Sequence, residues 1–153
     1  DGDTALMLST TSENIKMVEI LLPKSDAKAA DTGGHTALMW PARYGTAQMV
    51  VHLLPKSDVK AASTHGYTAL MVATLSGNVK MVEILLPKSD AKAATIHGYT
   101  TLMYAAHSGT AKMVERLLPK SDANASNQEG DTALNLAKAC RSKQIVRLLQ
   151  QYN

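Results

Sequence analysis

The sequence has a single cysteine, Cys140, so no disulfide can form within the chain. A disulfide-free chain fits a reducing compartment, and we expect a cytoplasmic protein or the intracellular part of a longer one. No apolar run reaches the roughly 18 residues that a membrane-spanning helix needs. The chain starts at Asp1 rather than at a methionine and opens with no secretory signal, which indicates a piece of a longer protein.

Phenylalanine is absent, and aromatic residues make up only 4% of the 153 residues. A hydrophobic fraction of 45% with 19% charged residues excludes a disordered chain. The net charge of +3 is too small to indicate nucleic-acid binding by itself. Methionine, in contrast, occurs eight times, and an internal repeat explains this number.

The chain repeats itself every 32 residues. The string Thr-Ala-Leu-Met begins at Thr4, Thr36 and Thr68, and the variants Thr-Thr-Leu-Met and Thr-Ala-Leu-Asn begin at Thr100 and Thr132. A second string, Leu-Leu-Pro-Lys-Ser-Asp, places its prolines at Pro23, Pro55, Pro87 and Pro119. Strings that keep one register so often exclude chance similarity. The chain therefore divides into five units, at about residues 1–31, 32–63, 64–95, 96–127 and 128–153, the last one shortened.

Each unit predicts two short helices, as the third shows. Thr68 suits an N-cap, residues 69–76 form the first helix, and Gly77 supplies the left-handed residue that ends it. Residues 79–86 form the second helix, which Pro87 stops. Helices this short are unstable alone, so each unit must bury its apolar face against the next. The expected fold is an all-α repeat solenoid of stacked helix–turn–helix units.

The methionines hold two fixed places in the unit. A methionine stripe can form a promiscuous binding groove or a thioether metal site. Each methionine lies in an apolar helical pattern, however, so we interpret the stripe as core. The first place holds Met7, Met39, Met71 and Met103, and the second holds Met17, Met49, Met81 and Met113.

With these strings in register, the chain resembles the ankyrin repeat family over essentially its whole length. That family has units of about 33 residues with a Thr-Pro-Leu-His-x-Ala signature, which stands here as Thr36-Ala37-Leu38-Met39 followed by Ala42. Alanine or threonine replaces the proline, and methionine replaces the histidine. We therefore expect methionine to fill, by packing alone, the space of the family's threonine–histidine hydrogen bond.

The resemblance implies an L-shaped unit with two antiparallel helices and a projecting hairpin-like loop. The loop tips and the exposed side of the first helices would then form a concave face that binds a protein partner, without enzymatic activity. Between units two, three and four the frame is constant, whereas these positions vary. Neutral drift at exposed positions is the alternative explanation. The predicted partner-binding residues are His35, Arg43, Tyr44, His65, Tyr67, Leu75, Tyr99 and His107.

Two aromatic residues of the first helices are expected in the core rather than on the binding face. Trp40 and Tyr104 follow the first-place methionine directly, so we interpret both as mainly core, with the Tyr104 hydroxyl in need of a partner. Pro41 falls inside the first helix of unit two, where its missing N–H predicts a kink or a late helix start.

No residue pattern indicates a metal, a cofactor or a catalytic centre. His65 and His97 repeat from unit to unit, but neighbouring helices lie about 8–10 Å apart, too far to share one ion. No phosphate-binding glycine loop, zinc-protease string or nucleophile elbow is present. Cys140 has basic neighbours but no base that the repeat would place beside it, so we interpret it as a bystander thiol.

Two further function classes stay open beside protein binding. A ladder of lysines could follow a nucleic acid or an anionic lipid, but aspartates interleave with it and favour a self-neutralising, solvated edge. The ladder comprises Lys24, Lys56, Lys88, Lys120, Lys28, Lys60 and Lys92. Alternatively, the array could assemble end to end, because unit one keeps an interior type of second helix. The last unit is polar and suits a cap, with Asn135, Lys138, Arg141, Gln144, Arg147 and Gln150.

Overall fold

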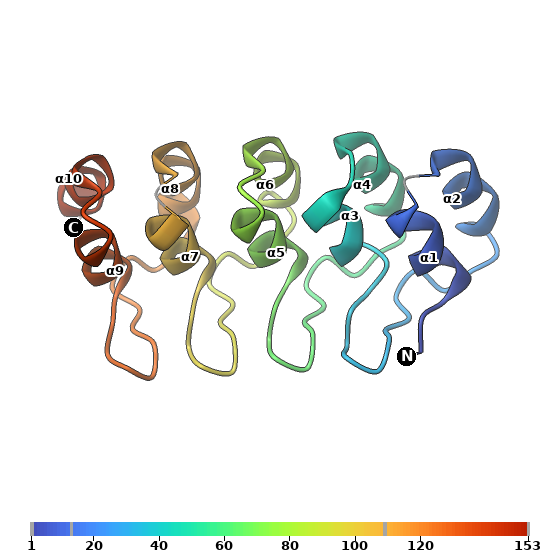
Figure 1. Cartoon of the computed structure of the whole chain (residues 1–153), viewed down its shortest axis with the longest axis horizontal. Helices are drawn as coiled ribbons and strands as arrows, with labels where there is room; N and C mark the ends of the chain where they lie inside the picture. Colours follow the sequence, from blue (N-terminus) through green and yellow to red (C-terminus); the bar gives the residue numbers. More distant parts are fainter. Residues whose placement is uncertain (1, 13, 109, 153) are drawn as a thin grey trace.

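A computed structural model describes residues 2–12, 14–108 and 110–152 of the chain. Within this part, ten α-helices form five pairs that stand in a row from the N-terminus to the C-terminus (Figure 1). Each helix contacts its pair mate and the equivalent helices of the neighbouring pairs. The predicted all-α repeat solenoid is confirmed. The helices are α1 (Ala5–Thr11), α2 (Ile15–Leu21), α3 (Met39–Tyr44), α4 (Ala47–Leu53), α5 (Ala69–Leu75), α6 (Val79–Leu85), α7 (Thr101–Ser108), α8 (Ala111–Leu117), α9 (Ala133–Ala139) and α10 (Lys143–Tyr152), and a 3-10 turn, η1 (Leu118–Lys120), follows α8.

Threonine caps begin most of the first helices. Thr68 Oγ1 accepts the backbone N–H of Met71 at 3.3 Å, so one of the free donors of the first turn is satisfied. In units one and four the methionine makes the reciprocal contact. The Sδ atoms of Met7 and Met103 lie 3.5 Å from the backbone N of Thr4 and of Thr100, respectively. The expectation that methionine only packs here was therefore wrong for these two units. A thioether sulfur is a weak acceptor, and it supplies a weak form of the reciprocal cap.

Helix α3 departs from its siblings, as Pro41 predicts. It begins at Met39, whereas α5 begins at Ala69, the equivalent of residue 37. The late start places Pro41 in the first turn, where no intrahelical N–H bond is lost. The backbone N–H of Met39 donates to the Thr36 carbonyl at 3.0 Å instead, and Thr36 Oγ1 stays without a partner in the described structure. The predicted late start is confirmed.

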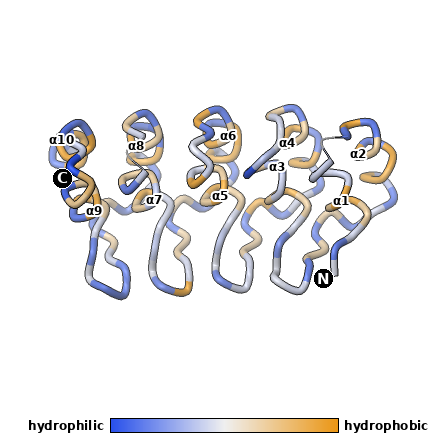
Figure 2. Tube along the Cα trace, in the orientation of Figure 1, coloured by the Kyte–Doolittle hydropathy of each residue, from blue (hydrophilic) through white to orange (hydrophobic). Residues whose placement is uncertain are grey.

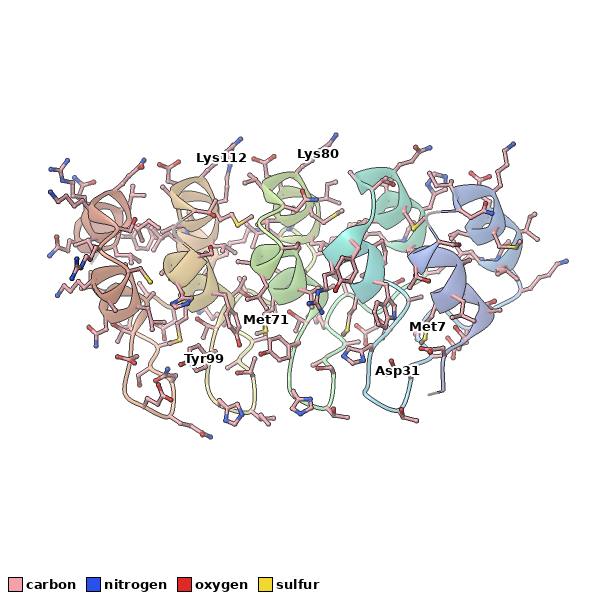
Figure 3. The ribbon with its side chains drawn as sticks, viewed as in Figure 1. Met7, Asp31, Met71, Lys80, Tyr99 and Lys112 are labelled. Carbon is pink, nitrogen blue, oxygen red and sulfur yellow. The ribbon has the colours of Figure 1, made fainter. Side chains whose placement is uncertain are left out.

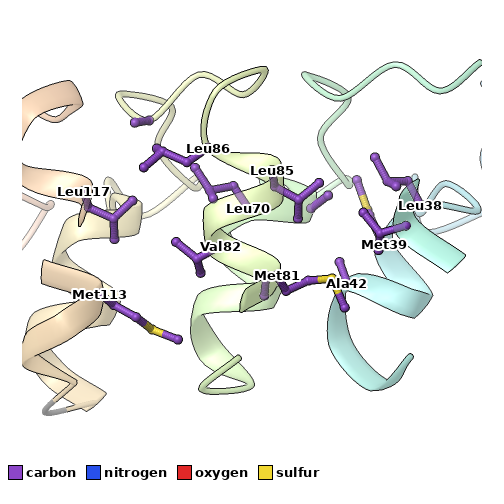
Figure 4. Close-up of a cluster of buried hydrophobic side chains, with 14 of the residues drawn as sticks. Leu38, Met39, Ala42, Leu70, Met81, Val82, Leu85, Leu86, Met113 and Leu117 are labelled. Carbon is purple, nitrogen blue, oxygen red and sulfur yellow. The ribbon is translucent and has the colours of Figure 1, made fainter. Parts of the chain in front are cut away.

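The core runs through all five units as one cluster of apolar side chains. Hydropathic colouring shows these residues on the helices, while the loops are largely neutral or hydrophilic (Figure 2). Seven of the eight methionines are buried, among them Met81 and Met113 with no exposed surface (Figure 4). The interpretation of the methionines as core is confirmed for these seven; Met17 is 43% exposed.

The loops that join neighbouring units all project to the same side of the array (Figure 1). An isolated antiparallel bridge closes the loop, for example between Ala62 and Thr68. Neighbouring loop tips are joined by a backbone hydrogen bond, in which the Ile96 N–H donates to the His65 carbonyl at 3.1 Å. Gly66 lies at this junction with a φ of 81°, and a Cβ there would come within 2.7 Å of Thr95 Cα. The tips of neighbouring loops are therefore in direct contact.

The two ends of the array differ in character. At the N-terminal end, Leu8, Met17 and Ile20 are 57%, 43% and 59% exposed, so the apolar face of unit one is incompletely covered. Met49, which holds the same place in unit two as Met17, is fully buried because unit one covers it. At the other end, the six polar residues expected of a cap are all exposed: Asn135, Lys138, Arg141, Gln144, Arg147 and Gln150.

Arg141 occupies a backbone conformation that glycine suits better. It has a φ of 55° and stands where unit three has Gly77, whose φ is 73°; Gly109, at the same place in unit four, lies outside the described residues. A left-handed conformation costs an L-residue about 1–2 kcal/mol, and the greater freedom of glycine in the unfolded chain offsets part of that cost.

We expect Arg141→Gly to stabilise the protein by about 0.5–1 kcal/mol in urea unfolding. The matched change, Gly77→Ala, should destabilise it by about 1 kcal/mol, because only the backbone strain differs. A Cβ on Gly77 would meet no atom within 4 Å. Loss of stability in Arg141→Gly would show that the arginine side chain makes a contact that outweighs the strain.

Candidate partner-binding site

A groove of about 790 Å³ lies between units two and three. Helix α3 supplies one wall, helix α5 the other, and the loop tips of the two units complete it. Six of the eight predicted partner-binding residues line this groove, although they come from two units and four segments. They are His35, Arg43, Tyr44, His65, Tyr67 and Leu75, joined by Met39, Trp40, Ser63, Val72 and Ser76.

Arg43 and Tyr44 form the exposed rim of the groove at the end of α3. The guanidinium carbon of Arg43 lies 4.8 Å from the centre of the Tyr44 ring, within the range of a cation–π contact. Tyr44 is 63% exposed, and Leu75 on the opposite wall is 50% exposed. Within the described residues, no carboxylate lies within 4.0 Å of Arg43. The rim thus presents a positioned cation beside apolar surface.

Trp40 is half-buried: it packs against the core cluster, as expected, but it also lines the groove, so its interpretation as mainly core holds only in part. Its ring lies 5.9 Å from that of His35, tilted by 50°. Trp40 follows the buried Met39, and one residue turns about 100° round a helix, which carries the side chain from the core to its edge. The indole Nε1 is buried without a hydrogen-bond partner in the described part of the chain. Val72, at the equivalent place on α5, is half-buried and lines the groove as well.

Three tyrosines from units three and four stack beside the groove. Tyr104 lies between Tyr67 and Tyr99, with ring centres 5.9 Å and 5.6 Å away. It is half-buried in this stack rather than mainly core, so that interpretation was wrong. Its hydroxyl does have the expected partner, because it donates to the Tyr67 hydroxyl at 3.2 Å. Burial, with this hydrogen bond, raises the pKa of Tyr104 well above its ordinary value of 10.0.

Tyr99 does not line the groove but lies next to it, on the loop of unit four (Figure 3). Its hydroxyl donates to Glu129 Oε2 of unit five at 3.3 Å. Burial and the Glu129 carboxylate raise the pKa of Tyr99 as well. The stack of Tyr67, Tyr104 and Tyr99 therefore continues the groove toward unit five as a ridge of ring edges and hydroxyl groups.

The loop that carries His35 is held by Asp31. Asp31 Oδ1 accepts the backbone N–H groups of Gly33 and His35, both at 2.8 Å, and Oδ2 lies 3.0 Å from His35 Nδ1. Burial raises the pKa of Asp31, but the hydrogen bonds from His35 and Gly33 outweigh it and keep the pKa below 3.8. Ser63, Thr95 and Asn127 take the same place in the next loops, and each accepts a loop N–H. The Asp31 carboxylate is therefore already hydrogen-bonded within its own loop.

His107 lies apart from the groove, beside Cys140. It is exposed near the end of α7, and its Nδ1 lies 3.5 Å from Cys140 Sγ of unit five. The expectation that no base stands beside this thiol was wrong. The two residues are 33 positions apart, so only the stacking of α7 on α9 brings them together.

The repeated histidines form no metal-binding cluster within the described residues. Among the described residues, no group of three or more histidine, cysteine or acidic side chains could hold a metal ion. The aspartates of the lysine edge bind backbone rather than lysine: Asp58 Oδ1 accepts the Lys60 N–H at 3.0 Å, as Asp26, Asp90 and Asp122 do in their own units. The positive charge of the lysines is therefore offset by the nearby aspartates without direct ion pairs among the described residues.

No described helix combines the length and apolar character needed to cross a bilayer.

The chain was compared with known protein families. A family model described as ankyrin repeats (3 copies) matches residues 1–63, 24–97 and 87–153, which together cover the whole chain. No curated protein matches the chain.

Proposed function

Because the chain belongs to the ankyrin repeat family, we propose that it binds a protein partner through its concave face, with the groove between units two and three at the centre of the contact. Ankyrin repeats are generally protein–protein interaction scaffolds and are typically non-enzymatic. The observation that supports the proposal is that six of the eight residues predicted on the loop tips and first helices line one groove.

The proposed mechanism is recognition by a surface that is already in place. Stacked helices hold α3 and α5, and the loop tips are joined by hydrogen bonds such as that from the Thr64 N–H to the Gly33 carbonyl at 2.9 Å. Binding on such a surface orders few groups, so little conformational entropy is lost. Tyrosine and arginine on the rim supply large contact area together with directional polar groups.

The test compares alanine substitutions on the two sides of the array. Tyr44→Ala with Leu75→Ala should weaken partner binding more than ten-fold with little change in the thermal midpoint, because both side chains are largely exposed. Tyr67 and Tyr99 are less suitable, since each stacks on Tyr104 and alanine there would also cost stability.

The matched control is Lys80→Ala with Lys112→Ala. These lysines project from the far side of the helices, away from the loops (Figure 3). The partner is chosen as a protein that wild type retains, and we expect this control to retain it as well. If that partner is lost from the lysine variant and kept by the Tyr44 and Leu75 variant, the concave face is the wrong site.

Self-association is a second candidate function, favoured by the exposed apolar side chains Leu8, Met17 and Ile20. The polar C-terminal end, with exposed Lys138 and Arg147, does not complement that face. We therefore expect any self-association to join two N-terminal ends rather than head to tail. Sedimentation equilibrium over a range of concentrations tests it: a monomeric mass at the highest concentration would eliminate this candidate.

A further inference from the structure

We infer that the groove between units two and three recognises an acidic, extended segment of its partner, in which an aspartate or glutamate stands two or three residues from an apolar side chain. The inference rests on the proposed function and adds the chemistry of the ligand. It follows from the charge of the groove, from the spacing of its two walls and from the apolar surface of α5.

The charge of the groove has one sign. Its eleven lining residues include Arg43 and two histidines, and no aspartate or glutamate. Asp31, which binds His35, has a side chain only 9% exposed, and its oxygens are used by His35 and two backbone N–H groups. Arg43 is therefore a cation without an internal carboxylate partner in the described residues.

Arg43 is also positioned for a carboxylate. A guanidinium presents five donors in a planar fork that matches the two oxygens of a carboxylate. Stacking over the Tyr44 ring at 4.8 Å limits the rotation of the group before any ligand arrives. A hydrogen bond to a charged group is stronger than a neutral one, so an acidic side chain is the ligand group that gains most from this rim.

The wall formed by α5 favours an apolar side chain in the partner. Leu75 holds the place on α5 that Arg43 holds on α3, 32 residues earlier, and it is 50% exposed. Val72 lies on the same wall. Burial of apolar surface is worth about 25 cal/mol per Å², so a partner side chain that covers Leu75 contributes to affinity.

The spacing of the two walls sets the spacing in the ligand. Neighbouring packed helices lie about 8–10 Å apart, and an extended chain rises about 3.3 Å per residue. A segment that crosses from Arg43 to Leu75 therefore spans two or three residues. The groove volume of about 790 Å³ lies in the range of about 300–1,000 Å³ for sites that enclose a ligand of a few side chains.

The test uses a random peptide library displayed on phage and selected on the full chain. We expect enrichment of aspartate or glutamate two or three residues from leucine, isoleucine, valine or an aromatic residue. Selection on Arg43→Gln should keep the apolar residue and lose the acidic enrichment, and selection on Arg43→Glu should favour lysine or arginine. Peptides from the wild-type selection without an acidic preference would overturn the inference.

One selected peptide then gives the quantitative test. Trp40 is the only tryptophan of the chain and lines the groove, so its fluorescence reports binding directly. Glutamine in place of the acidic peptide residue should weaken binding about ten-fold, and Arg43→Gln should do the same. Combining both changes should cost little more than either alone, because they remove one shared contact. Losses that multiply would overturn the pairing.

Failure of the ligand chemistry can be told apart from failure of the site. Peptides that lose binding to the Tyr44 and Leu75 variant but show no acidic preference leave the proposed site intact and overturn the acidic segment. Peptides that bind this variant as strongly as wild type overturn the site itself. Arg43→Lys serves as the conservative control, and partial retention of binding there supports a charge contact with guanidinium geometry.

Discussion

Gly66→Ala is expected to destabilise the protein by about 2–4 kcal/mol. Two costs combine. The residue has a φ of 81°, which an L-residue adopts at a cost of about 1 kcal/mol. The new methyl group would also lie 2.7 Å from Thr95 Cα and 3.0 Å from Ile96 N, both backbone atoms that cannot turn aside.

The loop junction must open to accommodate the methyl group. That movement stretches the hydrogen bond from the Ile96 N–H to the His65 carbonyl and separates units three and four at their tips. The strain of overpacking, with this weakened hydrogen bond included, costs about 1–3 kcal/mol and adds to the backbone cost of about 1 kcal/mol. Urea unfolding followed by circular dichroism measures the sum.

Gly130→Ala is the matched control. Gly130 has a φ of 82° in the loop of unit five, but a Cβ there would meet no atom within 4 Å. It should therefore cost only the backbone term, about 1 kcal/mol. Equal losses for the two variants would mean that the loop junction contributes nothing to stability, and that the helices alone hold the units together.

Met81→Ala should destabilise the protein by about 2–5 kcal/mol. The side chain is fully buried between units two and three, where it packs within the core cluster of both units (Figure 4). Truncation removes apolar contact and leaves a cavity that helices α4 and α6 cannot close without moving.

Met17→Ala, at the same place in unit one, should cost less than about 1 kcal/mol, because this residue is already 43% exposed. Thermal and urea unfolding of the two variants give the comparison. A large loss for Met17→Ala that grows with protein concentration would indicate that a second copy covers this face. A small loss for Met81→Ala would mean that the core repacks around the missing side chain.

Repetition made much of the fold predictable. The same strings in one register identified the caps, the helix ends and the buried positions, so the helix expected at residues 69–76 differs from α5 by one residue. Pro41 was informative for the same reason, since a residue that breaks a rule obeyed by its siblings marks a local departure. The concave face implied by the family resemblance, together with variation between units, likewise identified six residues that line the candidate groove.

Contacts between units were harder to predict, because they depend on how one unit sits on the next. Trp40 and Tyr104 lie at the border between core and surface, and a periodic pattern cannot separate the two sides of such a border. The pair of His107 and Cys140 is 33 residues apart and meets only because α7 packs on α9. The thioether cap of Thr100 was missed since methionine is normally assigned to packing alone.

The 32-residue register of the stacked loops has a consequence for how such genes change. Since each loop tip donates to the one before it by the same bond, recombination that removes one whole unit still joins matching surfaces. Loss of residues 68–99, for example, would place α7 beside α3 and set His107 opposite Arg43 in place of Leu75. Unequal crossing-over would thus replace one wall of a groove with the wall of another unit and leave the repeated frame unchanged. New binding specificities would then arise by shuffling of units rather than by point mutation.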